Sequence, residues 1–176
     1  MSITMSTKIK LTPESLISEL RKHNFGVLGT VSRRGRPQAT GVVYCTSAKG
    51  NPLALYVMTA RETKKVRNIM RNPNVSFVVT IPRTIFTFAP MNCIQFQGNA
   101  IILEAQDIEA LKSFRSTRMG RMFLGMFEKM SPEETGTVCF VKIIPHSIIH
   151  TFGIGISMID MLRNLGQGQG KVTFTE

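Results

Sequence analysis

The stretch Leu55-Tyr-Val-Met-Thr-Ala-Arg-Glu-Thr-Lys-Lys-Val-Arg-Asn-Ile69 passes from a strand pattern directly into a helix pattern. Its first residues are apolar or β-branched, as in a strand, whereas Val66 and Ile69 recur at the spacing of a buried helix face. Thr59 and Glu62 have the spacing of a capping box, so we expect the helix to begin here. The free amide groups of its first turn would then point toward the end of the strand.

Basic residues gather at the start of this helix. Between residues 61 and 72 there are five basic residues and one acidic residue, and three of the five lie in the first turn. Helix N-termini attract phosphate, whereas cations at that end oppose the usual dipole preference. The pattern therefore favours an anion site, with charge and donors from Arg61, Thr63, Lys64 and Lys65. The alternative is an ordinary surface helix whose basic residues are only solvated.

The rest of the chain predicts many short strands and few helices. Further helices are expected over 13–22, 107–114 and 118–130, and strands over 25–32, 37–45, 53–59, 75–81, 93–104, 137–144 and 147–152. Such a succession indicates a mainly β fold, an antiparallel barrel with helices packed outside it. We expect one domain over residues 1–176, with a flexible Gly/Gln segment at 166–170.

Composition limits the classes of protein to which the chain can belong. A hydrophobic content of 43% with 19% charged residues is typical of a globular chain. The net charge of +11 attracts anions of many kinds, nucleic acid and nucleotide cofactors included. The three cysteines, Cys45, Cys93 and Cys139, lack the paired spacing of zinc or redox motifs, so we interpret them as buried thiols.

Neither a membrane span nor an export signal is expected. Apolar runs such as Val75–Val79 and Ile143–Ile149 fall well short of the roughly 20 residues that a membrane helix needs. The first ten residues carry no apolar core or cleavage site. We therefore expect a cytoplasmic protein.

From Phe25 to Glu104 the sequence resembles the pyridoxamine 5'-phosphate oxidase-like FMN-binding split-barrel family. The matching parts are the strand Phe25-Gly-Val-Leu-Gly-Thr-Val-Ser32, the basic turn after it, the strand Pro37-Gln-Ala-Thr40, the Thr59 to Ile69 junction and Asn72-Pro73-Asn74-Val75. Their order and spacing match the family. The resemblance implies a split β-barrel and the cofactor FMN.

The resemblance also implies which residues bind the cofactor. Phosphate and ribityl groups would be bound by Met58, Thr59, Thr63, Lys64 and Lys65. The isoalloxazine ring would be lined by Arg36, Pro37, Gln38, Ala39 and Thr40. Members of the family commonly form homodimers with the cofactor between the subunits, and we expect the same here.

Two departures from the family pattern bear on the substrate. A family glutamine would fall near Cys93, whereas this chain offers Gln95 and Gln97. The true oxidases of vitamin B6 end in a substrate-binding arginine and histidine pattern that is not found between Thr151 and Glu176. Pyridoxamine phosphate is therefore not the expected substrate.

Three weaker patterns have simpler interpretations. His146 and His150 stand four apart in a predicted strand without a third ligand nearby, so no metal site is expected. Gly153-Ile154-Gly155 is interpreted as a turn. The methionines and phenylalanines of Arg118 to Met130 lie among basic residues, as in helices that bind membranes or partners. We interpret this segment as a helix that closes the barrel or the dimer interface, where flexible methionine side chains fill irregular gaps.

The sequence as a whole predicts an FMN-binding flavoprotein, a flavin-dependent oxidoreductase acting on an unidentified small-molecule redox substrate. The cofactor would supply the redox chemistry, and no side chain can be named as catalytic. One alternative is a split barrel that binds deazaflavin or haem. Another is a basic nucleic-acid-binding module, against which stand the absence of Trp and the two Tyr residues.

Overall fold

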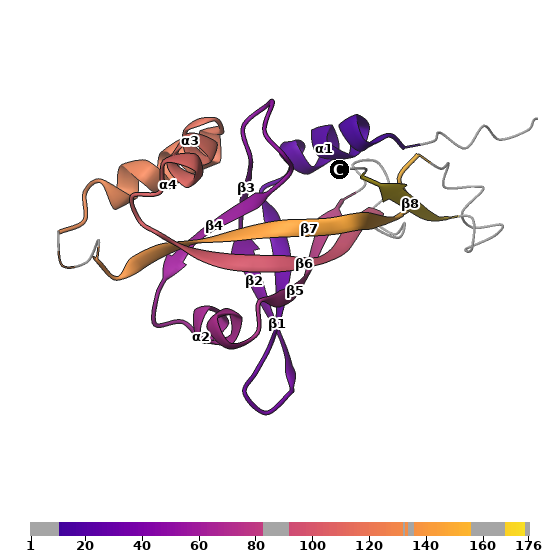
Figure 1. The fold of residues 1–176 in the computed structure, drawn as a ribbon. Coiled ribbons are helices and arrows are strands. Elements are labelled where there is room, and N and C mark those ends of the chain that lie inside the picture. The colour runs from indigo at the N-terminus through magenta and orange to yellow at the C-terminus, as the bar shows by residue number, and fades with distance from the viewer. Residues whose placement is uncertain (1–10, 83–91, 132, 134–135, 156–167, 175–176) are drawn as a thin grey trace, which may run out of the picture.

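The computed structural model describes residues 11–82, 92–131, 133, 136–155 and 168–174 (Figure 1). The helices are α1 (Pro13–Lys22), α2 (Lys64–Arg71), α3 (Ile108–Arg115) and α4 (Arg118–Phe127). The strands are β1 (Phe25–Val31), β2 (Pro37–Val43), β3 (Cys45–Thr46), β4 (Leu55–Ala60), β5 (Asn74–Ile81), β6 (Asn92–Glu104), β7 (Val138–Phe152) and β8 (Gln169–Thr173).

These strands form one antiparallel sheet that curls into a split barrel. Its order is β2-β1-β5-β6-β7-β4-β3, and β8 pairs with β7 off this path. Strands β2 and β4 stand far apart in this order, yet both line the same small pocket, so the curled sheet brings them together without pairing them. Helices α3 and α4 lie together on one side of the sheet and α2 lies on the opposite side (Figure 1). The predicted antiparallel split barrel is confirmed.

The inside of the curled sheet holds the main core. Side chains alternate between buried and exposed along β5, as expected for a strand with one face against a core. Phe77 of β5 stacks on Phe96 at 5.6 Å and meets the edge of Tyr44 at 5.4 Å. The Tyr44 hydroxyl donates to the Leu20 carbonyl oxygen over 2.9 Å and so fixes α1 against the barrel. Burying each large side chain of this kind stabilises the fold by about 1.5–3 kcal/mol.

A second core cluster lies under α3 and α4, on the other face of the sheet. Phe114 of α3 packs on Phe140 of β7, with 5.2 Å between the ring centres. Asp107 caps α3 and Thr117 caps α4, each by accepting from a backbone amide three residues ahead. Gly120 lies so close to the end of α3 that a Cβ there would overlap the Phe114 carbonyl group. The two helices therefore pack as one layer over this end of the sheet.

The strand expected over 137–144 and the strand expected over 147–152 are a single strand, β7, so the expected interruption at Pro145 is wrong. Pro145 pairs with Gly98, and the register then shifts so that Phe96 pairs with Ile149. A proline lacks the amide hydrogen that a regular ladder needs, and a bulge is one of the few places where a strand tolerates it. Pro145 in the sequence therefore marks a bulge within one strand and not a break between two strands.

The capping box expected at Thr59 and Glu62 is also wrong. Thr59 lies within β4 and pairs with Cys139 of β7, and the strand continues to Ala60. The helix begins only at Lys64. Pairing with β7 therefore extends the strand beyond the point that the local pattern predicts.

The flexibility expected for the Gly/Gln segment at 166–170 stays a prediction, and the structure describes residues 168–170 of it. Gln169 and Gly170 belong to β8 and pair with Phe152 and Thr151 of β7. Residues 166–167 lie outside the described part of the chain.

All three cysteines are free thiols, with Cys45 and Cys139 buried and Cys93 half-buried. None of the helices in the described ranges is long and apolar enough to cross a membrane.

Candidate functional site

The junction between β4 and α2 presents open backbone amides. Thr63 occupies the N-cap position, but its hydroxyl donates backward to the Ala60 carbonyl oxygen over 3.0 Å and does not cap the helix. The first turn of α2 contains no acidic residue. Its amide groups and the positive end of the helix dipole are therefore available to an anion.

Lys65, in this first turn, is half-buried beside the split of the barrel. It lines a pocket of about 180 Å³ together with Gly41 of β2, Met58 of β4 and Phe123 of α4. Burial lowers the pKa of the Lys65 ammonium group. Within the described ranges no acidic side chain pairs with Lys65. A desolvated cation without a partner is costly on its own, and an anion in the pocket would offset that cost.

A hydrogen-bond network joins α2 to the hairpin of β1 and β2. The buried Asn68 donates from Nδ2 to Thr30 Oγ1 over 3.0 Å and to Gln38 Oε1 over 2.8 Å. Gln38 is one of the predicted ring-lining residues, and its side chain thus faces α2. The network fixes the distance between the helix with the open amides and the strand expected to lie along the ring.

Among the described strands, β2 is an edge strand: it pairs with β1 on one side and with no other strand on its second side. An edge strand presents alternating backbone N–H and C=O groups to whatever lies beside it. Here the free edge faces the split between β2 and β4. Before the strand, the Arg36 amide donates to Ser32 Oγ over 3.1 Å and stabilises the turn.

The structure brings some predicted site residues together and leaves others apart. Met58 and Lys65 share the pocket at the split, and Gln38 joins them through Asn68. Lys64 is exposed at the start of α2, and Thr59 lies in β4 beside Cys139. Of the remaining predicted residues, Thr63 is the N-cap of α2, Thr40 is half-buried in β2, and Arg36, Pro37 and Ala39 are exposed in or just before β2.

Sequence reasoning missed Asn68, and it did not foresee the ion-pair partner of Arg61. Asn68 is a polar residue between the apolar positions Val66 and Ile69 of a short helix, and a buried amide in such a place needs partners. Arg61 forms an ion pair with Glu104 of β6, so its charge is already balanced. The buried Cys139 lies near this pair, and desolvation raises the pKa of its thiol.

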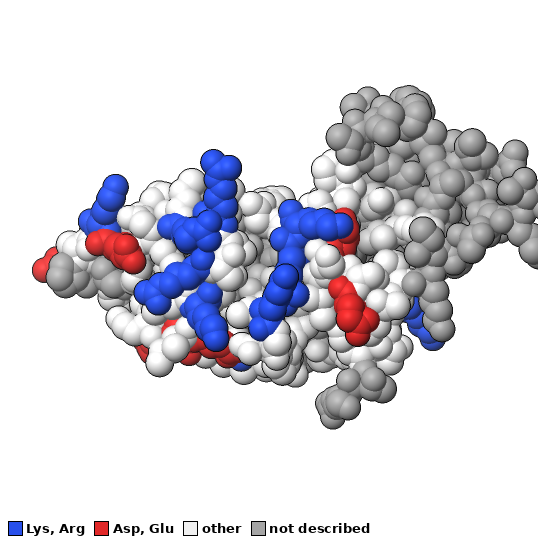
Figure 2. Space-filling view, turned by 90° about the horizontal axis from the view of Figure 1, so that it is seen from above, with Lys and Arg blue, Asp and Glu red and all other residues white. Residues whose placement is uncertain are grey.

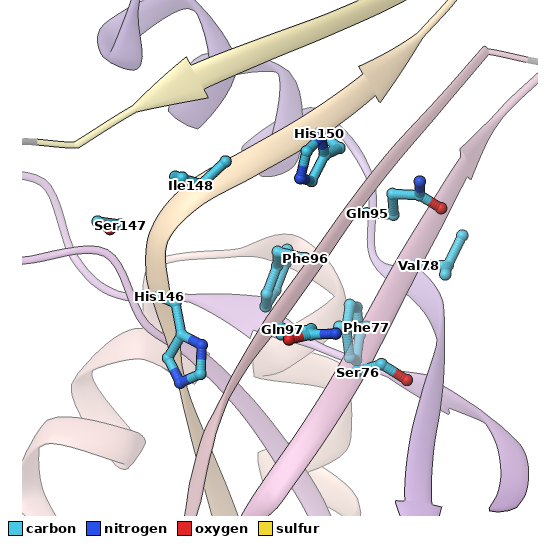
Figure 3. A pocket seen from close by; sticks show the side chains of 10 residues that line it. All are labelled: Ser76, Phe77, Val78, Gln95, Phe96, Gln97, His146, Ser147, Ile148 and His150. Carbon is cyan, nitrogen blue, oxygen red and sulfur yellow. The ribbon is translucent and has the colours of Figure 1, made fainter.

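A second and larger pocket, of about 600 Å³, lies on the outer face of the sheet, over a part of β5, β6 and β7 that α3 and α4 leave uncovered (Figure 3). Strand β7 contributes His146 and His150, and β5 and β6 contribute Ser76, Gln95 and Gln97 (Figure 3). Both histidines are exposed. In the described ranges, His, Cys, Asp and Glu side chains form no group of three that could hold a metal ion.

A sequence profile described as pyridoxamine 5'-phosphate oxidase matches residues 13–150, well over half of the chain. No curated protein matches the sequence significantly.

Solved structures with the same fold include proteins that bind different ligands. HutZ, a haem storage protein from Vibrio cholerae, has a TM-score of 0.61 at 20% identity, over 82% of this chain and 98% of that one. A haem-binding protein from Mycobacterium smegmatis has a TM-score of 0.59 at 15% identity, over 85% of this chain and 52% of that one. An FMN-binding protein from Nostoc punctiforme, related to pyridoxamine 5'-phosphate oxidase, has a TM-score of 0.55 at 13% identity, over 94% and 98%.

At these identities the structural matches establish the fold alone. The profile match and the curled antiparallel sheet agree with each other. This chain belongs to the pyridoxamine 5'-phosphate oxidase family of split barrels.

Proposed function

We propose that this protein binds FMN at the split between β2 and β4 and serves as a flavin-dependent oxidoreductase for a small-molecule substrate. One observation carries the proposal: the half-buried Lys65 has a lowered pKa, no acidic partner within the described ranges, and a place in the uncapped first turn of α2. A phosphate group satisfies both the cation and the open amides.

The donor set fits the phosphorylated flavin. The phosphate is bound by Lys65, by the first-turn amides of α2 and by Thr63 at its N-cap. The free edge of β2 offers alternating backbone donors and acceptors to the polar edge of the isoalloxazine ring. Met58 lines the pocket between them. The Asn68 network holds α2 and β2 at a fixed separation, so it orients both ends of the site. FMN supplies hydride or electron transfer when it is bound.

The size of the pocket supports a homodimer. Pockets that bind small molecules and cofactors, such as FMN, usually enclose about 300–1,000 Å³. The pocket at the split encloses about 180 Å³, so one protomer covers only part of an FMN molecule. A second copy would complete the enclosure.

The uncovered face of the sheet suits this second copy. It carries the exposed Phe25, Ile144 and Ile148, and its pocket is lined by neutral polar side chains and the two histidines. Apolar and uncharged surfaces are typical of homodimer interfaces. We therefore assign the dimer contact to this face and not to the basic helices α3 and α4.

Titration with FMN and with riboflavin, which lacks the phosphate, tests the site. Hydrogen bonds to charged groups contribute about 1.5–3 kcal/mol, so Lys65→Met is expected to weaken FMN binding about 10- to 100-fold. Riboflavin binding should stay the same. Lys64→Met, an exposed neighbour with the same charge, is the matched control and should have a smaller effect. If Lys65→Met binds FMN as tightly as the parent protein, the phosphate site lies elsewhere.

Haem is a second candidate, favoured by the large pocket on the uncovered sheet face. About 600 Å³ is enough for a cofactor of that size, and His146 and His150 supply imidazoles that can ligate haem iron. Titration with haemin distinguishes the candidates, because a ligated haem gives an intense Soret band that His146→Ala or His150→Ala should abolish. Deazaflavin, the third candidate, is recognised by its own absorption spectrum.

A further inference from the structure

The outer surface of α3 mixes cations with an apolar side chain. Ile108, Lys112 and Arg115 are spaced four and three residues apart, so they lie on one face of the helix. All three are exposed, and Ile108 is 82% exposed. The opposite face buries Ala110 and Phe114 against the second core. The exposed stripe thus plays no part in holding the fold together.

Helix α4 repeats this pattern beside α3. Its buried positions are Gly120 and Leu124, whereas Arg118, Arg121, Met122 and Met126 are exposed. Met122 is 53% exposed and Met126 is 60% exposed. Arg121 donates from Nη1 to the Arg115 carbonyl oxygen over 3.0 Å, which brings the basic residues of the two helices together.

The basic surface extends from α4 to the end of α1. Arg21 and Lys22 of α1 line the same hollow, of about 170 Å³, as Arg118. Figure 2 shows Lys and Arg side chains spread over the region of α3, α4 and α1, with fewer acidic side chains among them. Glu19 pairs with Lys22 and His23, which balances the charge of Lys22, and Glu109 pairs with Lys142 of β7. We call this surface the basic helical face.

A second copy of the chain does not fit this face, because two such faces would bring cations against cations. Nucleic acid would match the cations but leaves the exposed Ile108, Met122 and Met126 without a role, since phosphate contacts do not use aliphatic side chains. A lipid bilayer with anionic headgroups uses both. The cations meet the headgroups, and the aliphatic side chains enter the boundary with the acyl chains.

We propose that the basic helical face binds the surface of a bilayer that contains anionic lipids. Helices α3 and α4 lie in the plane of the membrane, and the end of α1 adds further cations at the headgroup level. The protein rests on the bilayer and does not cross it. This role is independent of the cofactor, because the split between β2 and β4 is not part of the basic helical face.

Co-sedimentation of the full chain with lipid vesicles tests the proposal. Binding is expected to vesicles of phosphatidylcholine mixed with phosphatidylglycerol and not to phosphatidylcholine alone. Removal of one cation near an anionic surface weakens the partition coefficient by about fivefold. The variant Arg118→Gln/Arg121→Gln should therefore bind about 20- to 30-fold more weakly. Arg33→Gln/Arg34→Gln removes the same charge from the exposed β1–β2 turn, on the opposite side of the molecule from α3 and α4, and should bind as the parent does.

The methionines separate a membrane from other polyanions. Met122→Ser/Met126→Ser keeps every charge, so weaker vesicle binding by about tenfold or more supports insertion of apolar side chains. Equal vesicle binding by this variant overturns the proposal. So does tight binding of a DNA or RNA oligonucleotide through Arg118 and Arg121 without vesicle binding. Circular dichroism of each variant shows that a loss of binding does not come from unfolding.

Discussion

Asn68 of α2 donates a hydrogen bond from Nδ2 to Gln38 Oε1 of β2 over 2.8 Å, and the same amide group donates to Thr30 Oγ1 over 3.0 Å. The helix with the open amides is thereby tied to the strand at the free edge of the barrel. A single side chain fixes the spacing between the two parts of the site. Stability and ligand affinity should therefore both depend on it.

Asn68→Ala is expected to lower the free energy of unfolding by about 1–3 kcal/mol. The change removes both hydrogen bonds and leaves the buried Thr30 hydroxyl without this donor, which costs the desolvation of a polar group. Urea denaturation followed by circular dichroism measures the change. Asn51→Ala, in an exposed turn, is the control and should alter stability little. Equal stability of Asn68→Ala and the parent would contradict this account of the network.

The ligand-free protein should become more stable as the pH rises through the folded-state pKa of Lys65. Burial lowers this pKa, so between it and the ordinary lysine value the unfolded state binds more protons than the folded state. Stability therefore increases with pH in that window. Lys65→Met should remove the increase and stabilise the ligand-free protein at neutral pH. Urea denaturation over a pH series tests this, and an increase that persists in Lys65→Met would have another source.

Gly120→Ala should destabilise the packing of α4 on α3. The new methyl group would overlap the backbone of Phe114, which cannot move as a side chain end can, and overpacking of this kind costs about 1–3 kcal/mol. Gly125→Ala, in the same helix, meets no atom within 4 Å and should gain up to about 1 kcal/mol from helix propensity. Thermal unfolding of Gly120→Ala and of Gly125→Ala measures the change in stability that each substitution causes. Similar changes in both variants would mean that the helices are not in close contact.

The ion pair under α3 predicts a loss of stability in acid. Lys142 Nζ lies 2.6 Å from Glu109 Oε2, and this contact lowers the pKa of Glu109. The resulting stability is present above the unfolded-state pKa of a glutamate and is lost as the pH falls through the lowered folded-state value. Because the pair is partly exposed, we expect about 1 kcal/mol or less.

Glu109→Gln should remove this part of the acid sensitivity. Unfolding in urea between neutral and acidic pH shows it as a smaller decrease in stability than that of the parent. The exposed Glu62→Gln has no ion pair within the described ranges and serves as the control. An identical pH profile for Glu109→Gln and the parent would show that the pair contributes nothing.

The sequence predicts the elements of this fold because hydrophobic periodicity and caps are local properties. The helix expected over 13–22 matches α1, and the hairpin around the basic turn matches β1 and β2. The errors arise where a distant strand decides the outcome. Thr59 does not cap α2, because β4 continues to pair with β7 through Thr59 and Ala60, opposite Cys139 and Val138. Pairing partners far along the chain are invisible to local patterns.

The candidate site was predictable in part. The basic start of α2 is a local signal, so Lys65 was found from the sequence. The partners of Asn68 lie 38 and 30 residues away, and only the curled sheet brings them to the helix. The exposed lysine and the half-buried lysine, Lys64 and Lys65, look equivalent in the sequence. Their difference depends on the pocket between β2 and β4.

The visible absorption spectrum of the protein after incubation with FMN and removal of free ligand tests the central claim most directly. We expect a retained flavin spectrum, whose absorption band in the blue bleaches when a chemical reductant or a reduced nicotinamide is added without oxygen. We also expect no oxidation of pyridoxamine phosphate by the FMN-loaded protein. A colourless protein after desalting, or one that retains haem with a Soret band while releasing FMN, would contradict the central claim.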